Sequence, residues 1–243
     1  LLDVFETHVF YLSKIIYKTN LLIPFKLKED IIDRYKNLTN QKSKYFTFMG
    51  PQPVTLNHEN IVLDKYGSIL INYAVTEKAD GDRYELFITD NHGYLINSKC
   101  ELIDTDTTFP SLSGEWLIDG EYITKNKFHE DIRLFMAFDV YWGGYLTPQP
   151  LYTYPFYNPQ DDISRSEYLQ IFNKSIETIE RGKPEWGPGE MPLRFGVKEY
   201  KFGYLTNEEV DPKKLEQMDV MKIFESSKSI IDKDDNGGFE YRT

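Results

Sequence analysis

Lys78 lies in a run of residue types that can do chemistry on a phosphate, Thr76-Glu77-Lys78-Ala79-Asp80-Gly81-Asp82-Arg83. The stretches on both sides are apolar and rich in residues that favour strands, so we expect the lysine at the end of one strand, before a tight Asp-Gly turn. A lysine at the end of a strand, followed by a tight Asp-Gly turn and an arginine, can act as a nucleophile toward a nucleotide phosphate. This run is the most informative feature of the sequence.

Two more strands are expected to bring carboxylates to the same chemistry. The apolar stretch Trp116–Ile123 contains Asp119-Gly120-Glu121, and Leu134–Tyr141 contains Asp139. A charged group inside an apolar strand is costly to bury unless it is paired or used. Carboxylates can hold a divalent ion, and the ion neutralises a polyphosphate. One lysine and two acids on adjoining strands therefore suit phosphate chemistry.

Each part of this pattern, taken alone, has a plainer structural interpretation. Asp-Gly is a common turn, Lys78 could be a surface residue, and Phe138 could belong to the core. The single Cys100 suits packing, and it excludes a disulfide framework and a cysteine zinc site. Three strands that each carry a charged group, in this order, are stronger evidence for phosphate chemistry than any one of them alone.

The order of these motifs resembles the covalent nucleotidyltransferase superfamily of mRNA capping enzymes and polynucleotide ligases. Lys78–Arg83 resembles its first motif, Leu117–Glu121 its third, and Phe135–Tyr141 the one that follows. Met49–Leu56, with Asn60-Ile61 beyond it, resembles the Gln-Pro-Val-Ser segment of capping guanylyltransferases. The Lys-Ala-Asp-Gly sequence is similar to that of the multifunctional capping enzymes of giant DNA viruses.

The resemblance implies a reaction and the residues that carry it. Lys78 would attack the α-phosphate of GTP to form a covalent Lys–GMP intermediate, and GMP would then pass to the 5′-diphosphate end of RNA. The other implied nucleotide contacts are Arg83 and Glu121 at the ribose, Phe138 stacked on the guanine, Asp139 near the lysine, Lys198, and Lys99 in place of an arginine of the family. Glu121 and Asp139 are also the implied ligands of Mg²⁺ or Mn²⁺.

The chain departs from the family's pattern at its C-terminal side. Its Asp-Gly pairs are 80–81 and 119–120, so the fourth motif of the family is absent, as are the final lysine motif and the oligonucleotide-binding-fold lid. Two alternatives remain. One is an ATP-dependent polynucleotide ligase, against which Gln52-Pro53-Val54 argues. The other is a non-catalytic nucleotide-binding scaffold, against which the intact set of Lys78, Arg83 and Glu121 argues.

Periodicity and turn signals predict the elements that must position these residues. Helices are expected at 1–20, 27–39 and 164–181, the last with Ser164 as N-cap, and one or two more at 212–231. Strands are expected at 84–89 and 94–97 around a hairpin turn, and at 116–123, 134–141 and 193–202; loops are expected at 49–53, 143–162 and 185–189. This mixture indicates an α+β fold. The resemblance implies an ATP-grasp-like nucleotidyltransferase core whose antiparallel sheets flank a nucleotide cleft.

Composition and chain ends set the wider expectations. The 243 residues carry a net charge of -11, which confines any RNA contact to a local basic groove. No apolar run is long enough to span a bilayer, and the expected location is the cytoplasm, or a viral factory or virion. The chain starts at Leu1 and stops at Thr243, which indicates an internal piece of a larger protein. We expect a helical connector at 1–44, a guanylyltransferase domain at 45–243, and an RNA triphosphatase and a cap methyltransferase as fused or associated partners.

Overall fold

The computed structural model describes residues 2–17, 23–55, 57, 74–126, 128–146, 150–157, 164–182 and 192–202. Asn60-Ile61, the strand residues expected before Ala74, the loop at 185–189 and the helices at 212–231 lie outside these residues. The chain divides into two compact units. The first comprises Leu1–Gly50, Gly81–Thr124 and Ile132–Val197, and the second comprises Pro51–Asp80, Lys125–Asp131 and Lys198–Thr243.

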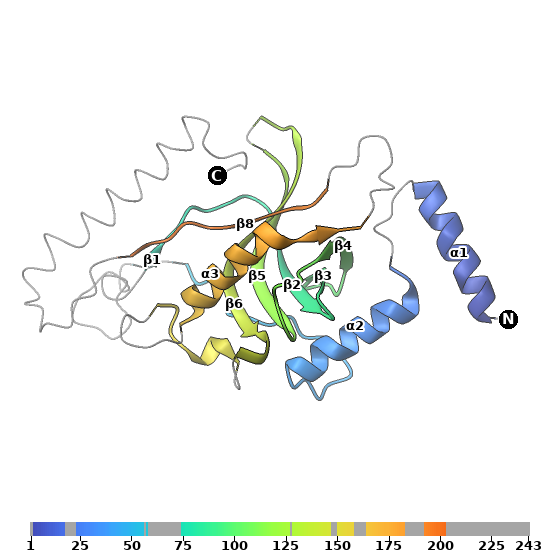
Figure 1. Cartoon of the computed structure of the whole chain (residues 1–243), viewed down its shortest axis with the longest axis horizontal. Coiled ribbons are helices and arrows are strands. Elements are labelled where there is room, and N and C mark those ends of the chain that lie inside the picture. Colours follow the sequence, from blue (N-terminus) through green and yellow to red (C-terminus); the bar gives the residue numbers. More distant parts are fainter. Residues whose placement is uncertain are drawn as a thin grey trace, which may run out of the picture. The chain divides into compact units, whose positions relative to one another are not determined.

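A seven-stranded sheet forms the centre of the first unit, in the order β7-β4-β3-β2-β5-β6-β8 (Figure 1). The strands are β2 (Asp82–Thr89), β3 (His92–Asn97), β4 (Leu102–Thr108), β5 (Trp116–Lys125), β6 (Asp131–Gly143), β7 (Glu180–Arg181) and β8 (Arg194–Val197). β2 pairs antiparallel with β3 and with β5, whereas β6 and β8 pair parallel. The fold is therefore a mixed sheet with few helices, which confirms α+β but not a purely antiparallel sheet.

The sequence predicts a hairpin turn at Asp90–Gly93, and the structure confirms the hairpin with a shorter turn, since His92 and Gly93 already belong to β3. Asp90 and Asn91 link the strands with positive φ angles of 49° and 63°. Two-residue hairpin turns of this type need positive φ at both positions, and aspartate and asparagine tolerate it better than most residues. The turn fixes the register that sets Tyr84 opposite Asn97.

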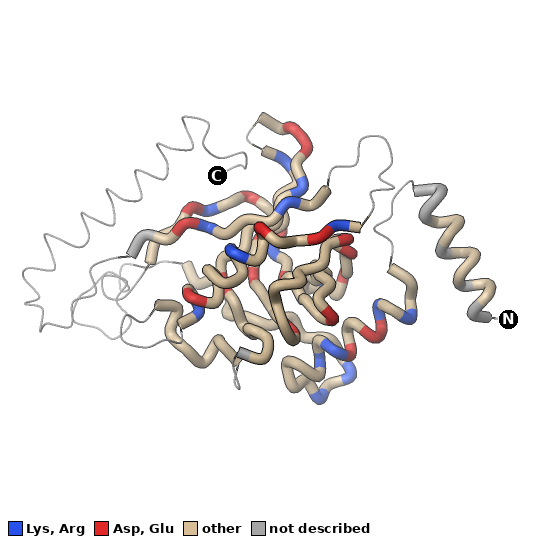
Figure 2. The backbone as a smooth tube through the Cα atoms, in the orientation of Figure 1, with Lys and Arg blue, Asp and Glu red and all other residues tan. Residues whose placement is uncertain are grey.

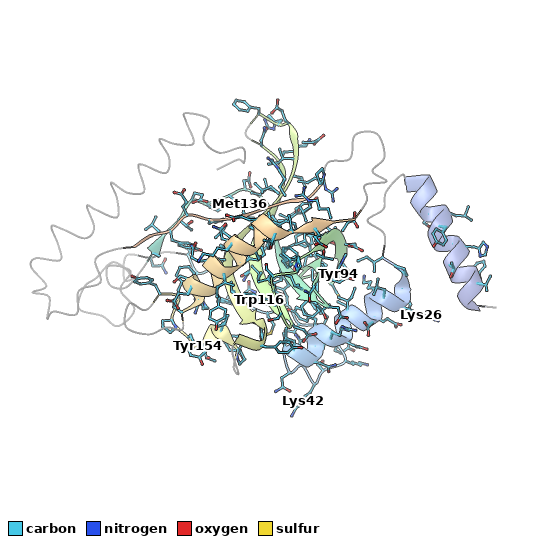
Figure 3. All side chains as sticks on the ribbon, in the orientation of Figure 1. Lys26, Lys42, Tyr94, Trp116, Met136 and Tyr154 are labelled. Carbon is cyan, nitrogen blue, oxygen red and sulfur yellow. The ribbon has the colours of Figure 1, made fainter. Side chains whose placement is uncertain are left out.

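One helix covers each face of the sheet. In the β2–β5 register Phe87 lies opposite Leu117, so these two side chains share a face and their neighbour Trp116 lies on the other. Tyr35 of α2 (Phe25–Leu38) packs edge-on against Phe87, with ring centroids 5.8 Å apart. Tyr168 of α3 (Arg165–Ser175) packs against Trp116 at 6.0 Å. Figure 3 labels Trp116 among the side chains packed around the sheet.

The helices agree with their sequence signals except at one end. α1 (Leu2–Tyr17) and α2 confirm the helices expected at 1–20 and 27–39. α3 begins after Ser164, whose backbone N–H donates to Glu167, as the capping box predicts. It ends at Ser175 rather than 181, followed by the 3-10 turn η4 (Ile176–Thr178) and β7. The β-branched residues after Ser175 favour extended backbone, which explains the early end.

Two expected segments are more divided than their sequences suggest. The loop expected at 143–162 contains the short 3-10 helices η2 (Gly144–Leu146) and η3 (Leu151–Thr153). The strand expected at 193–202 is two strands in different sheets, β8 in the first unit and β9 (Lys201–Phe202) in the second. β9 pairs antiparallel with β1 (Ala74–Val75), which leads to Lys78.

Candidate functional site

Register places four ionisable side chains on one face of β2 and β5. Arg83 lies opposite Glu121, and Glu85 lies opposite Asp119. Side chains two residues apart in a strand point the same way, and directly opposed residues of an antiparallel pair share a face. The first and third motifs named above therefore meet through ordinary strand pairing.

Arg83 is held by a two-point ion pair to a fully buried acid. Its Nε donates to Oδ1 of Asp119 at 3.0 Å, and its Nη2 donates to Oδ2 at 2.5 Å. The hydroxyl of Tyr141 on β6 donates to the same Oδ2 at 2.5 Å. Asp119 is 0% exposed, while the Arg83 side chain keeps 27% exposure. The Arg83 guanidinium is thus fixed by Asp119 and remains partly exposed to solvent.

Burial and charge act against each other in this pair. Burial opposes the charge of Arg83, but the hydrogen bond and the negative charge of Asp119 outweigh it and raise the Arg83 pKa. Burial raises the pKa of Asp119, and the hydrogen bond and charge of Arg83 lower it again in part. Arg83 therefore remains protonated, and it supplies the charge that lets a carboxylate sit in the sheet.

Phe48 and Gly50 lie next to this arginine. The Cζ atom of Arg83 lies 5.4 Å from the ring centroid of Phe48, in cation–π range. Gly50 has φ +105°, and a Cβ atom there would lie 2.5 Å from Tyr141 Oη and 2.8 Å from Arg83 Nη2. A side chain at position 50 would strain the backbone and displace Tyr141 or Arg83, so both the backbone angle and the contacts favour glycine.

Glu121 contacts the residue that precedes β2. The backbone N–H of Gly81 donates to its Oε1 at 3.3 Å. The structure has a bend at Gly81 in place of the expected tight Asp-Gly turn, and a Cβ atom there would come within 2.6 Å of the carbonyl oxygen of Tyr122, so this bend needs glycine in order to approach β5. Glu121 itself is half-buried.

Phe138 and Asp139 lie on β6, and the structure gives Asp139 a partner that the sequence had not indicated. Nε of Arg165, the first residue of α3, donates to Oδ1 of Asp139 at 2.8 Å. Burial raises the Asp139 pKa, and the charge and hydrogen bond of Arg165 lower it in part. Phe138 is half-buried. Its role as a base-stacking residue remains a prediction.

Lys78 and Lys198 both lie in the second unit. Lys78 is exposed, and Lys198 is 7% exposed. β1 and β9 pair with Val75 opposite Lys201, and the strand pairing ends before Lys78 and Lys198, because residues 76–80 and 198–200 are outside any strand. The Thr76 hydroxyl donates to the carbonyl oxygen of Glu199 at 2.6 Å, so the two segments stay close beyond the paired residues.

Lys99 lies in the turn between β3 and β4. Its backbone N–H donates to Oδ1 of Asn97 at 3.0 Å, and its side chain is exposed. Because Asn97 lies opposite Tyr84, this turn is at the same end of the sheet as Arg83. Lys99 is therefore suitably placed for a lysine that substitutes for an arginine, and that role remains a prediction.

The two expected metal ligands, Glu121 and Asp139, accept hydrogen bonds from different partners. Within the described residues, His, Cys, Asp and Glu form no group of three or more that could hold a metal ion. Arg165 occupies an oxygen of Asp139 and would compete with a cation there. Carboxylates remain the donors that Mg²⁺ and Mn²⁺ prefer, and a nucleotide's phosphates would supply more oxygens. Glu121 accepts a hydrogen bond from the Gly81 N–H, so both carboxylates already have partners, and their roles as metal ligands remain predictions.

Sequence reasoning missed the side chains that hold the site together. Asp119 was noted as part of a motif but not as the partner of Arg83, and Tyr141, Phe48 and Arg165 were not assigned roles. One signal was available for Asp119: it precedes Glu121 by two residues, so the strand presents both acids on the same face. The others depend on pairing between distant elements.

Two comparisons with known proteins bear on this site. The family model described as mRNA capping enzyme, catalytic domain, matches residues 21–166. A protein named "Probable mRNA-capping enzyme" from Acanthamoeba polyphaga mimivirus is 31% identical over 146 residues, which are 57% of this chain and 11% of the viral protein. The chain thus spans only a small part of that relative's length. Across the described residues, the helices are too short or too polar to cross a membrane.

Proposed function

The chain belongs to the family of mRNA capping enzyme catalytic domains, and from this premise we propose that it is an mRNA guanylyltransferase. Lys78 is the proposed nucleophile toward GTP. Arg83 and Glu121 are proposed to contact the ribose, Phe138 the guanine, and Lys198, Lys99 and Asp139 the remainder of the nucleotide.

The observation that carries this proposal is the fixed position of Arg83. The arginine follows the Lys78-Ala79-Asp80-Gly81 run, and Asp119, from the strand that also carries Glu121, holds two of its nitrogens. A guanidinium fixed in this way can bind a ligand oxygen without first losing its own freedom of movement. Ordinary packing would not require an arginine that is bound on one side and still exposed in part.

The proposed reaction has two balanced steps. Nζ of Lys78, as the free amine, attacks the α-phosphorus of GTP, the bond to the β-phosphate oxygen breaks, and pyrophosphate leaves while the amine loses a proton to water. A terminal oxygen of the RNA 5′-diphosphate then attacks the same phosphorus. The phosphorus–nitrogen bond breaks, and the lysine amine regains a proton. The protein mainly contributes position and charge neutralisation.

A divalent cation is part of this proposal. Mg²⁺ or Mn²⁺ bound to the triphosphate would neutralise charge that develops on the leaving pyrophosphate. Glu121 is the proposed protein ligand, with Asp139 as a second ligand if the cation displaces Arg165.

The wider setting is also proposed. We infer that the domain works as part of a longer multifunctional polypeptide, because the viral relative is far longer than the stretch it shares with this chain. An RNA triphosphatase and a cap methyltransferase are the proposed neighbours, since they carry out the steps before and after guanylyl transfer. The cytoplasm or a viral factory is the proposed location.

Intact mass spectrometry under denaturing conditions tests the proposal. The chain, and a version that continues past Thr243, are incubated with Mg²⁺ and either GTP or ATP. Lys78→Ala is compared with Lys42→Ala, a control that removes an exposed lysine from the turn after α2 (Figure 3). We expect a GMP-sized adduct with GTP, present in Lys42→Ala and lost in Lys78→Ala.

The other outcomes distinguish the alternatives. An adduct with ATP only would assign the chain to the polynucleotide ligases. No adduct on the longer version with either nucleotide would favour a non-catalytic nucleotide-binding protein. An adduct that persists at wild-type level in Lys78→Ala would exclude Lys78 as the nucleophile.

A further inference from the structure

A hydrogen bond between two fully buried side chains joins α2 to the strand that carries Arg83. The hydroxyl of Tyr35 donates to Oε2 of Glu85 at 2.5 Å, and both residues are 0% exposed. The other carboxyl oxygen of Glu85, Oε1, has no hydrogen-bond partner within the described structure. Burying a carboxyl group and leaving one oxygen unsatisfied costs free energy, so an arrangement of this kind calls for an explanation.

The Tyr35 hydroxyl also binds residues 48–50, which lie next to Arg83. The backbone N–H of Met49 donates to Tyr35 Oη at 3.0 Å. The neighbours of Met49 are Phe48, whose ring stacks against the Arg83 guanidinium, and Gly50, which lies against Arg83 and Tyr141. One side chain of α2 therefore ties residues 48–50 and β2 together, next to the ion pair described above.

Packing alone does not explain these polar groups. The Tyr35 ring already contacts Phe87 at 5.8 Å and Phe46 at 5.0 Å, and a phenylalanine could make both contacts. Tyr35 also belongs to a hydrophobic cluster with Tyr94, Leu117 and Tyr141. What the hydroxyl and the carboxyl add is a fixed position for residues 48–50. Groups that bind a ligand are most effective when their supports hold them in place.

We propose that Tyr35 and Glu85 are positioning residues that hold residues 48–50 against Arg83, and that α2 is thereby part of the nucleotide site. The inference rests on the proposed function, because it assigns Arg83 to nucleotide binding. Figure 2 marks charged residues along α2, and these are exposed or half-buried, whereas Tyr35 is fully buried. The role is conveyed through hydrogen bonds; neither residue is proposed to touch GTP.

Tyr35→Phe tests the proposal, and Tyr94→Phe is its matched control. Both variants remove one hydroxyl from the same hydrophobic cluster, but the Tyr94 hydroxyl does not bind Met49 or Glu85. Amide hydrogen exchange gives the first measurement. We expect the Met49 amide to exchange about fivefold faster in Tyr35→Phe, the effect of losing one ordinary hydrogen bond, and to be unchanged in Tyr94→Phe.

The second measurement is the GTP dependence of Lys–GMP formation. We expect KM for GTP to rise about tenfold in Tyr35→Phe with a smaller change in kcat, because a displaced Arg83 weakens binding of the nucleotide. Glu85→Gln keeps an acceptor oxygen for Tyr35, so we expect it to remain near wild type in both measurements. A purely structural role would lower thermal stability in both tyrosine variants without separating their KM values.

The outcomes separate this inference from the proposed function. A wild-type chain that forms no adduct, even when extended past Thr243, would refute the function and the inference together. A wild-type chain that forms the adduct, with Met49 exchange or KM unaltered in Tyr35→Phe, would refute the inference alone. Equal losses in Glu85→Gln and Tyr35→Phe would also overturn it, since they would mean that the carboxyl group of Glu85, rather than its bond to Tyr35, is what matters.

Discussion

Replacing Asp119 with asparagine should destabilise the first unit far more than a similar change at the surface. The carboxylate accepts three hydrogen bonds, from Arg83 Nε, Arg83 Nη2 and Tyr141 Oη. Asparagine keeps one acceptor oxygen, and its amide group would point donor hydrogens at groups that are themselves donors. Arg83 would then retain a positive charge without its carboxylate.

The size of the effect follows from the burial of the two partners. Removing one member of a fully buried ion pair costs about 3–5 kcal/mol of unfolding free energy. Water can reach part of the Arg83 side chain, which is 27% exposed, and the substituted asparagine retains one acceptor. Both facts reduce the penalty, so we expect a loss of about 2–3 kcal/mol.

Urea unfolding followed by tryptophan fluorescence measures this loss, since Trp116 and Trp142 are buried in the same unit. Asp30→Asn is the control: it also removes an aspartate from an ion pair of the first unit, with Arg34 at 3.0 Å, but the Asp30 side chain is 56% exposed. Exposed pairs contribute about 0–1 kcal/mol. If Asp119→Asn and Asp30→Asn unfold at the same urea concentration, the account of Arg83 as a guanidinium held by a buried acid is wrong.

Three further predictions concern neighbouring residues. Phe138→Ala should weaken GTP binding, measured by calorimetry, with little change in Tm; a matching collapse of Tm would make Phe138 a core residue instead. Gly50→Ala should lower GTP affinity and stability together, by about 1–3 kcal/mol of unfolding free energy, because the added carbon collides with Tyr141 and Arg83; wild-type values would contradict that geometry. Burial raises the Glu85 pKa well above 4.5, so the folded chain keeps a proton that the unfolded chain releases, and wild-type stability should fall as pH rises above about 4.5 until the folded pKa is passed. The stability of Glu85→Gln relative to wild type should therefore rise with pH, by at most about 1.4 kcal/mol per pH unit, in urea titrations from pH 4 to 8; a difference independent of pH would refute it.

Local signals were sufficient for the elements that frame the site. Asp90–Gly93 predicts a hairpin because few residues other than those at its start tolerate two positive φ angles in succession, and the Ser164/Glu167 pair predicts the start of α3 because it satisfies helix N–H groups. Apolar stretches rich in strand-forming residues also identified β2, β5 and β6, although Arg83 precedes the expected bounds of its strand. In each case the residues that determine the element lie within it or within a few positions of it.

The parts that could not be predicted depend on which distant elements meet. No local pattern states that β8 lies parallel to β6, or that Arg165 at the start of α3 reaches Asp139. Nothing in the run around Lys78 indicates that Asp119, rather than the acids beside it in sequence, holds Arg83. The expected division of the chain at residue 44 remains a prediction, although α2 buries Ile31 and Tyr35 in the core of the sheet.

The contacts around Arg83 also set a condition on how the protein is made. Arg83 and Asp119 are separated by 36 residues, Tyr35 and Glu85 by 50, and Arg83 and Tyr141 by 58. Contacts between distant residues form slowly, because closing the loop between them costs conformational entropy before the contact can stabilise the chain. During synthesis the β2–β3 hairpin can form early, but the Arg83 cluster cannot be completed until Tyr141 has left the ribosome. A nascent chain therefore carries the Lys78 motif long before it has the surroundings that the motif needs.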